Sequence, residues 1–336
     1  MTPSNTRERV LRALEKASAR GLSGEALARE LGVSRVAVGK HVAALRDQGY
    51  VIDASAGSGY RLVEAPDIAL PFEISRRVHN PLWGPFTGGL VTGSTNADAR
   101  ALAKSGAVEG AVVSVARQLE GRGRLGRSWA SPEGGAYVSV VLRPGIAPAE
   151  MGPLALVVGL GISRGLERLG VASQLKWPND LLRQGRKLAG ILLEMSAEGD
   201  RVDWVVAGFG INVRRPQGAA PEAAYLSDVV DVSVADAAAA ALDGVAVTYR
   251  EWLDNGFSTL LPQYLQRFAL MDEQVTVRDA TGTVRARGVV QGVDEDGRLL
   301  VLAEDGLVPV ASGEVTLRDP LDGQGLSTYR KPLSRE

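Results

Sequence analysis

A run of seven residues, 121–127, combines three glycines with three arginines and one leucine. Glycine weakens both helices and strands, and the apolar segments on either side, residues 112–116 and 137–142, have the composition of strands. The run is therefore predicted to be a loop that joins two strands. Its backbone N–H groups and guanidinium groups favour a site for an anion such as a phosphate or a carboxylate. The alternative is a solvated, mobile basic loop.

The same run matches the pattern G-x-G-x-x-G, which occurs in dinucleotide-binding folds and in protein kinases. A dinucleotide site needs a helix that begins at the last glycine and an acidic residue about 20 positions later. Residues 128–135 contain a proline and two glycines, which disfavour a helix, and no such acidic residue is apparent. A kinase needs a valine after the last glycine and a His-Arg-Asp sequence, and the chain has neither. Both interpretations are disfavoured.

Composition limits the classes of protein and of site. With 336 residues, 45% of them apolar, two or three domains are expected, and a net charge of -1 gives no overall attraction to nucleic acid or membranes. The absence of cysteine excludes disulfides, thiolate metal sites and cysteine nucleophiles. Only two histidines are present, which excludes a histidine-rich metal site. The first residues lack an apolar signal core, and the longest apolar stretch, residues 154–162, is too short to cross a bilayer. A cytoplasmic protein with no membrane partner is expected.

The first 65 residues are predicted to form a winged helix-turn-helix domain that binds DNA. One apolar helix precedes two more, which Ser23 and Ser34 can cap and which a turn containing Gly32 separates. The third helix has an apolar face made of Val38, Val42 and Leu45. Residues 49–62 read as two short strands around a turn of small residues, which is typical of a wing.

Charge supports the DNA-binding interpretation modestly. Residues 1–65 contain ten Lys and Arg against seven Asp and Glu, a net charge of +3 in a chain that is otherwise slightly acidic. Arg35 and Lys40 are placed nearest the major groove and Arg61 on the wing near phosphate, so the predicted DNA contacts are Ser34, Arg35, Lys40 and Arg61. The alternative is a helical interaction domain with a solvated, charged face.

The rest of the chain is predicted to contain a linker, two domains and a tail, which gives an α+β protein overall. Residues 66–72 contain two prolines and are predicted to be the linker, and residues 73–270 the central α/β domain. Residues 271–318 alternate short strands with Thr-Gly and Asp-Gly turns, as a small β-barrel does. Residues 319–336 are expected to be a disordered tail.

Two polar segments of the central domain are candidate ligand sites. Ser94, Thr95 and Asn96 come directly before a helical stretch, so they can cap that helix or bind an uncharged polar group of a ligand. Residues 174–180 are predicted to form a strand that ends at Pro178 and places Asp180 just beyond its end. The Asp180 carboxylate can hold Mg²⁺, neutralise the arginines or cap a turn.

A hairpin across residues 197–200 is predicted to bring Lys187 and Asn212 to the same rim of the sheet. The candidates then supply several cations, one carboxylate and several neutral donors, with no evident nucleophile and no histidine base. Such a set suits chemistry that needs positioning and charge neutralisation, for example attack of a ligand carboxylate on the α-phosphate of ATP.

Five motifs occur in the order found in bacterial biotin protein ligases, which the chain therefore resembles: residues 94–96, Gln118 with 121–127, 176–180, 187–191 and 210–212. With the N-terminal module in front, residues 7–318 resemble the bifunctional biotin ligase and biotin-operon repressor. The resemblance implies a class II synthetase-like central domain and an SH3-like C-terminal domain. It also implies synthesis of biotinyl-5'-AMP from biotin and ATP with Mg²⁺, then transfer of biotin to a lysine of the biotin carboxyl carrier protein of acetyl-CoA carboxylase.

The resemblance also assigns site residues, motif by motif. It implies contacts with biotin from Ser94, Thr95, Asn96, Gln118, Arg122, Gly123, Arg124 and Lys187. It implies contacts with the nucleotide from Arg124, Arg127, Trp129, Asn179 and Asn212. Catalytic roles fall on Arg122, Arg124, Lys187 and Asp180, with Mg²⁺ brought by ATP near Asp180 and no metal site made of protein ligands alone.

Three departures from the family pattern are visible. Leu119 stands where a small or polar residue is usual, and Ala116 where an acidic one is common. Residues 214–244 match the family's adenylate-covering loop poorly, so no contacts are assigned there.

Two classes of function compete. The first is a ligase that also represses transcription, in which ligand ordering of the arginine-rich loop favours a homodimer on a two-fold operator DNA. The second is a regulator whose site only senses a metabolite, and a lipoate ligase is the nearest enzymatic rival. Lys187 together with the arginines favours catalysis, because a sensor need not neutralise a reacting phosphate.

Overall fold

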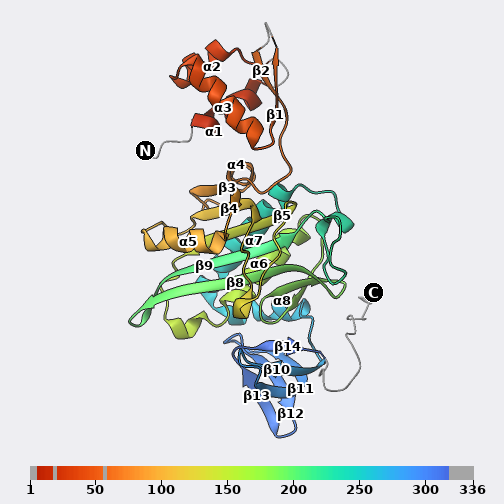
Figure 1. Cartoon of the computed structure of the whole chain (residues 1–336). Helices are drawn as coiled ribbons and strands as arrows, with labels where there is room; N and C mark the ends of the chain where they lie inside the picture. The colour runs from red at the N-terminus through yellow and green to blue at the C-terminus, as the bar shows by residue number, and fades with distance from the viewer. Residues whose placement is uncertain (1–5, 18–20, 56–58, 318–336) are drawn as a thin grey trace. The chain divides into compact units, whose positions relative to one another are not determined.

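The computed structural model describes residues 6–17, 21–55 and 59–317. The chain divides into two units, Met1–Asp67 and Ile68–Glu336, which are described separately (Figure 1). The predicted tail, residues 319–336, and the tip of the predicted wing lie outside the described residues.

The first unit contains three helices followed by a hairpin, as the winged helix-turn-helix prediction requires. The elements are α1 (Thr6–Ala17), α2 (Gly24–Leu31), α3 (Arg35–Asp47), β1 (Val51–Ser55) and β2 (Gly59–Glu64). The two strands are antiparallel, with Ser55 paired to Gly59. The predicted apolar face of α3 is buried: Val38, Val42 and Leu45.

Nearby residues determine where α2 and α3 begin and how the turn between them is made. The Ser23 hydroxyl accepts a hydrogen bond from the Ala26 amide at 3.0 Å, and the Ser34 hydroxyl accepts one from the Ala37 amide at 3.1 Å. Gly32 ends α2 with φ of 69°, a conformation that favours glycine. Because each cap satisfies a donor at a helix end, both ends of the turn are specified by nearby residues.

The second unit is built around a seven-stranded sheet with the order β3-β4-β5-β9-β8-β7-β6. Its strands are β3 (Phe86–Thr92), β4 (Val112–Gln118), β5 (Gly135–Leu142), β6 (Gln174–Lys176), β7 (Asp180–Arg183), β8 (Arg186–Glu198) and β9 (Arg201–Asn212). Strands β3 and β4 are parallel and the other neighbours are antiparallel. The arginine loop, residues 121–127, therefore joins neighbouring strands β4 and β5, and β8 and β9 form the predicted hairpin.

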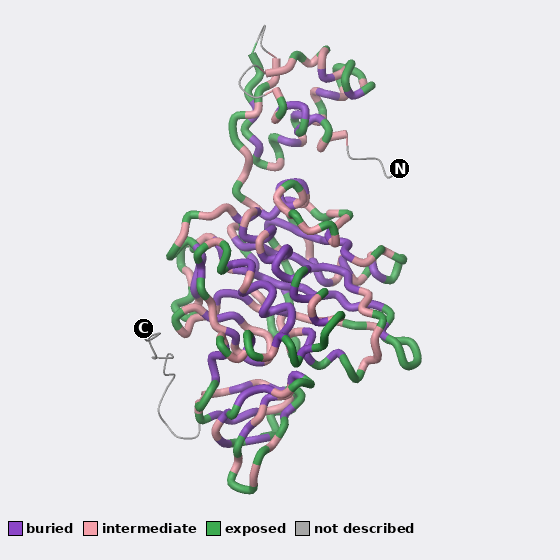
Figure 2. Tube along the Cα trace, turned by 180° about the vertical axis from the view of Figure 1, so that it is seen from behind, coloured by how far each residue is buried: buried purple, intermediate pink, exposed green. Residues whose placement is uncertain are grey.

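Helices cover both faces of this sheet. Alternate residues of β4 and β5 enter two separate apolar clusters, because successive side chains of a strand point to opposite faces. On one face α5 (Thr95–Lys104) packs on β4, β5 and β9. On the other, α6 (Leu154–Glu167) and α7 (Val234–Asn255) bury the larger core (Figure 2). Two short helices complete the unit, α4 (Pro71–Ser75), which begins inside the expected linker, and α8 (Leu261–Gln266).

Helices α6 and α7 approach each other closely at glycines. A Cβ atom added to Gly165 would lie 2.1 Å from the Ala240 carbonyl oxygen, and one added to Gly244 would lie 2.1 Å from the Gly161 oxygen. No Cβ atom tolerates such a distance, so the two backbones can touch only because these side chains are absent.

The segment Pro148–Glu167, which includes α6, has 20 residues and is long and apolar enough to cross a membrane by length and composition. It is longer than the apolar stretch of residues 154–162, which alone was predicted to be too short to cross a bilayer. In the described part of the chain, 72% of its most apolar window is buried. Its packing against α7 and the central sheet explains its composition, since a core helix needs apolar residues on most of its surface.

The C-terminal part of the second unit is a five-stranded antiparallel sheet with the order β13-β12-β11-β10-β14. Its strands are β10 (Gln274–Arg278), β11 (Val284–Val293), β12 (Leu299–Ala303), β13 (Gly306–Val310) and β14 (Glu314–Thr316). The Trp177 indole N–H of the central domain donates to the Gly297 carbonyl at 3.0 Å. A Cβ atom at Gly152 would lie 2.4 Å from the Asp296 carbonyl oxygen, so backbone meets backbone where this sheet packs on the central domain.

Candidate functional site

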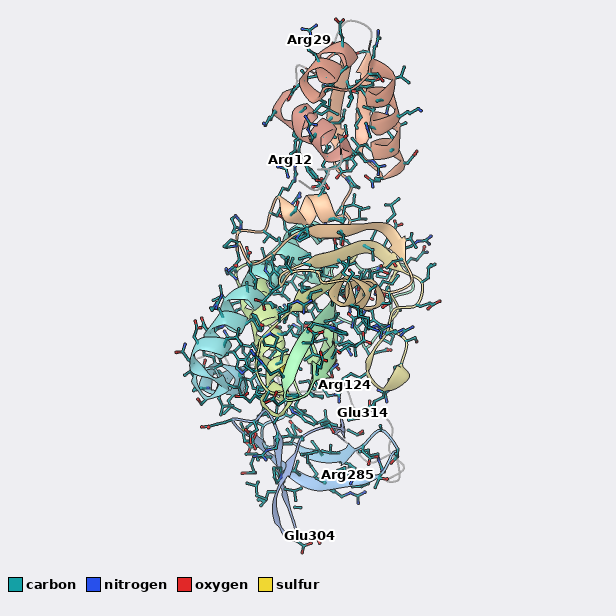
Figure 3. The ribbon with its side chains drawn as sticks, turned by 90° about the vertical axis from the view of Figure 1, so that its left-hand side faces the viewer. Arg12, Arg29, Arg124, Arg285, Glu304 and Glu314 are labelled. Carbon is teal, nitrogen blue, oxygen red and sulfur yellow. The ribbon has the colours of Figure 1, made fainter. Side chains whose placement is uncertain are left out.

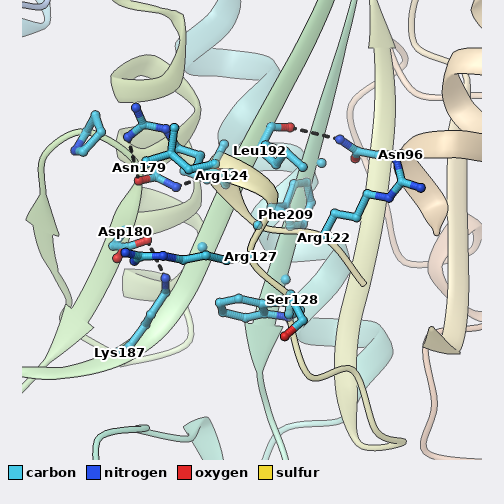
Figure 4. Close-up of a pocket in the computed structure, with 18 of the residues that line it drawn as sticks. Asn96, Arg122, Arg124, Arg127, Ser128, Asn179, Asp180, Lys187, Leu192 and Phe209 are labelled. Atoms are coloured by element: carbon cyan, nitrogen blue, oxygen red, sulfur yellow. Dashed lines mark hydrogen bonds and ion pairs between the residues drawn. The ribbon is translucent and has the colours of Figure 1, made fainter. Parts of the chain in front are cut away.

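A cavity opens between the first residues of α5, the arginine loop, the β6–β7 turn, the middle of β8 and β9, and the start of β14 (Figure 4). Twelve of the thirteen residues that the family resemblance assigned to ligand binding or catalysis line it, and Asn212 does not. Three further lining residues come from the C-terminal sheet and were not predicted: Gly313, Glu314 and Val315. The cavity is therefore formed by both parts of the second unit.

A polar wall organised by Gln118 forms one end of the cavity. The Gln118 side-chain oxygen accepts hydrogen bonds from the Thr95 amide at 2.8 Å and from the Thr95 hydroxyl at 3.0 Å. Its side-chain nitrogen donates to the Ser131 hydroxyl at 2.9 Å. Ser94 occupies the N-cap position of α5, but its side chain makes no capping hydrogen bond. The interpretation of this segment as an ordinary helix cap is therefore wrong for the Ser94 side chain.

Asn96 is held by three residues that no motif in the sequence indicated, Ser139, Leu192 and Glu194. Its side-chain nitrogen donates to the Leu192 carbonyl at 3.3 Å and to the Glu194 carboxylate at 2.9 Å, and its oxygen lies 2.7 Å from the Ser139 hydroxyl. Arg100 donates to the same carboxylate at 2.9 Å. Both amide donors are used within the protein, so only an oxygen lone pair remains for a ligand. The only signal for Ser139 was a polar residue within an otherwise apolar strand.

The arginine loop has a hydrogen-bonded turn of its own. The Gly123 amide donates to the Arg127 carbonyl at 2.8 Å, and Arg122 pairs with Ser128 in a short bridge. At the tip, Leu125 has φ of 56°, in the left-handed region that favours glycine. The loop therefore forms a tight turn, and two of its arginine side chains, those of Arg124 and Arg127, reach different partners.

Arg124 reaches the boundary between the central domain and the C-terminal sheet. Its guanidinium donates to the Asn179 side-chain oxygen at 3.4 Å and to the Gly313 carbonyl at 3.3 Å. Burial lowers the pKa of Arg124 from its ordinary value, and the nearby charges of Asp180 and Glu314 oppose that shift. The group stays charged, but its two hydrogen bonds are long and neither acceptor is ionised. An anion in the cavity would therefore gain a strong partner.

Arg127 is engaged by a carboxylate of the protein. Its two terminal nitrogens bond the two oxygens of Glu314, which lies 187 residues further along the chain. In Figure 3 Arg124 and Glu314 lie close together at the edge of the C-terminal sheet. The paired geometry matches the guanidinium fork to both carboxylate oxygens. Arg127 was predicted to contact the nucleotide, and no local pattern in the sequence pointed to Glu314 as its partner.

Lys187 lies where the arginine loop meets the central sheet. Its ammonium nitrogen is 2.7 Å from an Asp180 carboxylate oxygen and 4.9 Å from the centre of the Trp129 ring. The Trp129 indole N–H is buried and has no acceptor among the described residues. A buried donor without a partner is rare in folded proteins, so this N–H marks an unusual polar position in the wall of the cavity.

The two predicted asparagines differ in position. Asn179 lines the cavity, accepts from Arg124 and donates to the Ile191 carbonyl at 2.7 Å. Asn212 meets Lys187 at the rim, as predicted, but there its side chain donates to the Lys187 carbonyl at 3.1 Å. From that position Asn212 supports the backbone that carries Lys187.

Residues 214–228 also pass beside this rim. The Ala224 amide donates to the Lys187 carbonyl at 2.8 Å. The Arg215 guanidinium bonds Asp228 and lowers the pKa of that carboxyl.

In the first unit, α3 presents an exposed surface with cations. Arg35, Val36 and Lys40 are exposed, and neither cation has an ion-pair partner among the described residues. The Ser34 hydroxyl is used by the helix cap. Arg61 on β2 pairs with Asp53 on β1 at 2.7 Å, so the wing cation is partly neutralised. Arg35 and Lys40 are thus the predicted contacts that remain free for phosphate or base edges.

These features define a class of protein: a winged helix-turn-helix unit joined to a domain whose cavity has a neutral polar wall and a cluster of cations. Three known protein families match the chain, and their order along the sequence is that of the winged unit, the central domain and the C-terminal sheet. Residues 6–61 match an HTH domain, residues 89–212 the biotin/lipoate A/B protein ligase family, and residues 271–318 the biotin protein ligase C-terminal domain. The chain belongs to the bifunctional ligase/repressor family of biotin protein ligases.

Individual relatives support this assignment. The bifunctional ligase/repressor BirA of Bacillus subtilis is 33% identical over 94% of this chain and 99% of its own length. The BirA of Escherichia coli is 32% identical over 88% of this chain and 92% of its own. Among solved structures, the biotin protein ligase from Aquifex aeolicus in complex with biotin and ATP is 28% identical, with a TM-score of 0.60 over 70% of this chain and 98% of that one.

Proposed function

We propose that this protein activates biotin with ATP to biotinyl-5'-AMP, transfers the biotin to a lysine of the biotin carboxyl carrier protein of acetyl-CoA carboxylase, and represses transcription by binding operator DNA. The observation that carries the enzymatic part is the composition of one cavity. Neutral groups at Ser94, Thr95 and Gln118 suit the uncharged ring system of biotin, while Arg124 and Lys187 suit anions. The names of the relatives and the ligands of the Aquifex aeolicus structure support the same choice.

In the first proposed step a biotin carboxylate oxygen attacks the α-phosphorus of ATP. A new O–P bond forms, and the bond to pyrophosphate breaks. Two anions must approach each other, so Lys187, Arg122 and Arg124 lower the barrier by neutralising charge. Asp180 keeps the Lys187 ammonium in place from 2.7 Å. In the second step the amine of the acceptor lysine attacks the acyl carbon, AMP leaves with the bonding electrons, and the amine loses a proton.

Mg²⁺ fits this site as a companion of ATP. Two lining residues carry carboxylates, Asp180 and Glu314, and both are paired with cations. No group of three or more His, Cys, Asp or Glu residues within the described ranges could hold a metal ion. Because Mg²⁺ in nucleotide sites commonly needs only one or two carboxylates besides the phosphates, Asp180 would hold it together with ATP. The ion would neutralise phosphate charge.

The ligase proposal is tested by weighing an acceptor domain after incubation with the protein, ATP and biotin. A mass increase equal to one biotin minus water is expected, and it should require ATP. No increase would leave the ligand-sensing regulator as the better hypothesis. An increase with lipoate but not with biotin would identify the rival ligase instead.

For the DNA-binding part, we propose a homodimer in the cytoplasm whose two winged units meet the two halves of an operator. The exposed cations of α3 support DNA contact, because helices of this kind place their N-terminal residues against base edges. The relatives are named as repressors as well as ligases. Sedimentation with and without biotin and ATP tests the dimer.

The Lys40→Ala variant is expected to bind DNA about tenfold more weakly, since one specific side-chain contact contributes roughly 1–3 kcal/mol. The probe is the duplex that the wild-type protein selects from a random-sequence pool, and affinity is measured by fluorescence anisotropy at several salt concentrations. Lys16→Ala, an exposed lysine on α1, serves as the control. Equal affinities of the two variants would remove Lys40 from the DNA contacts.

The Arg124→Gly variant is expected to form the acyl-adenylate but to release it about tenfold faster, because a charge-assisted contact with the phosphate is lost. Release is followed by adding unlabelled ATP and biotin to a preformed radiolabelled complex. Unchanged release would count against a phosphate contact from Arg124.

A further inference from the structure

We infer that Glu314 of the C-terminal sheet is a positioning residue that, through Arg127, holds the arginine loop closed over the cavity. The loop then retains the acyl-adenylate for longer than its own hydrogen bonds would allow. The retention rests on the proposed function, whereas the closure can be measured without any ligand.

The contact that carries this inference joins the loop to a different domain. Both terminal nitrogens of Arg127 bond the two carboxylate oxygens of Glu314. The residues on either side of Glu314, Gly313 and Val315, line the cavity with the loop. Arg124 adds a hydrogen bond to the Gly313 carbonyl at 3.3 Å. Two arginines of one short loop thus bond two neighbouring residues, Arg124 to Gly313 and Arg127 to Glu314, which tie the loop to the rim of the C-terminal sheet.

The residue that receives the loop is anchored much better than the loop itself. Glu314 begins β14 and pairs with Arg278 of β10. A Cβ atom at Gly313 would lie 2.7 Å from a Val277 methyl and 2.9 Å from the Arg278 carbonyl oxygen, so this backbone lies tightly against β10. The C-terminal sheet is in turn fixed to the central domain by the hydrogen bond from Trp177 to Gly297. Glu314 is therefore a fixed point to which a movable loop attaches.

The solvent exposure of Arg127 and Glu314 limits how much their ion pair can stabilise the closed loop. The Arg127 side chain is 65% exposed and that of Glu314 is 40% exposed. Solvent screening limits such a pair to a factor of about five in an equilibrium constant. A tether of this strength favours the closed loop and still lets ligands enter.

Limited digestion with trypsin tests closure in the ligand-free protein, because the loop contains three arginines, each a cleavage site. Cleavage after Arg122 or Arg124 is normalised to cleavage after the exposed Arg29 of the first unit. In Glu314→Gln we expect loop cleavage about five times faster, since cleavage follows the open population. The control is Glu304→Gln, an exposed carboxylate at the far end of the same sheet (Figure 3), which should leave cleavage unchanged. Equal loop cleavage in Glu314→Gln and wild type would overturn the inference.

The double variant Arg127→Glu with Glu314→Arg separates a tether from a ligand contact. If the pair is a tether, each single charge reversal speeds loop cleavage and release of the radiolabelled adenylate, and the double variant restores both to within about twofold of wild type. If Arg127 instead contacts the nucleotide, the double variant releases the adenylate as fast as Arg127→Glu, which overturns the inference. A wild-type protein that forms no adenylate would overturn the proposed function alone, because the digestion result does not depend on it.

Discussion

The Lys187→Ala variant is expected to form the acyl-adenylate about 10²–10³-fold more slowly than the wild-type protein. Lys187 lies 2.7 Å from Asp180 and 4.9 Å from the centre of the Trp129 ring, where we propose that the ligand carboxylate and the phosphate meet. Removing it leaves two anions to approach with less neutralisation, and it also frees the Asp180 carboxylate to repel both. The polar wall around Gln118 stays intact, so biotin affinity should fall much less than the rate.

Pyrophosphate release in single-turnover experiments measures this rate, and calorimetric titration measures biotin affinity separately. Lys104→Ala, at an exposed position of α5, removes the same charge outside the cavity and should change neither quantity. A Lys187→Ala variant with a normal rate but weak biotin binding would assign Lys187 to ground-state binding instead of catalysis.

The Gly165→Val variant is expected to lose about 3 kcal/mol or more of its free energy of unfolding, or to accumulate as insoluble protein. The first added carbon would lie 2.1 Å from a backbone oxygen of α7, and neither helix can withdraw without opening the large core. Because the clash is with backbone, a change of rotamer cannot relieve it.

Urea unfolding followed by circular dichroism measures the loss. The matched control is Gly89→Val on the edge strand β3, where an added Cβ atom meets nothing within 4 Å. That variant should change the free energy of unfolding by less than about 1 kcal/mol. Similar losses at both positions would show that glycine itself, and not the contact of α6 with α7, determines the effect.

Those parts of the site that depend on neighbouring residues were predictable from the sequence. The strands on either side of the arginine loop, the hairpin of β8 and β9 and the meeting of Lys187 with Asn212 all follow from local patterns and turn residues. The caps of α2 and α3 belong to the same group, since Ser23 and Ser34 bond amides three residues away.

The partners that hold those residues could not be predicted in this way. Glu314 lies 187 residues from Arg127, and Glu194 lies 98 residues from Asn96, so no local pattern links them. Their contacts arise only when sheets and helices pack, and a surface glutamate in a short strand looks like any other. The contact of Asn212 with the nucleotide stays a prediction, because a polar residue at a strand end serves backbone support as readily as ligand contact.

The participation of β14 in the cavity has a consequence for synthesis of the chain. The chain emerges from the ribosome N-terminus first. The DNA-binding unit, Met1–Asp67, can therefore fold before the second unit has been synthesised. The wall containing Gly313 to Val315 emerges nearly 250 residues later. A nascent chain therefore has its DNA-reading helix long before it has a complete pocket, and the ability to respond to the small molecule is acquired later than the ability to bind DNA.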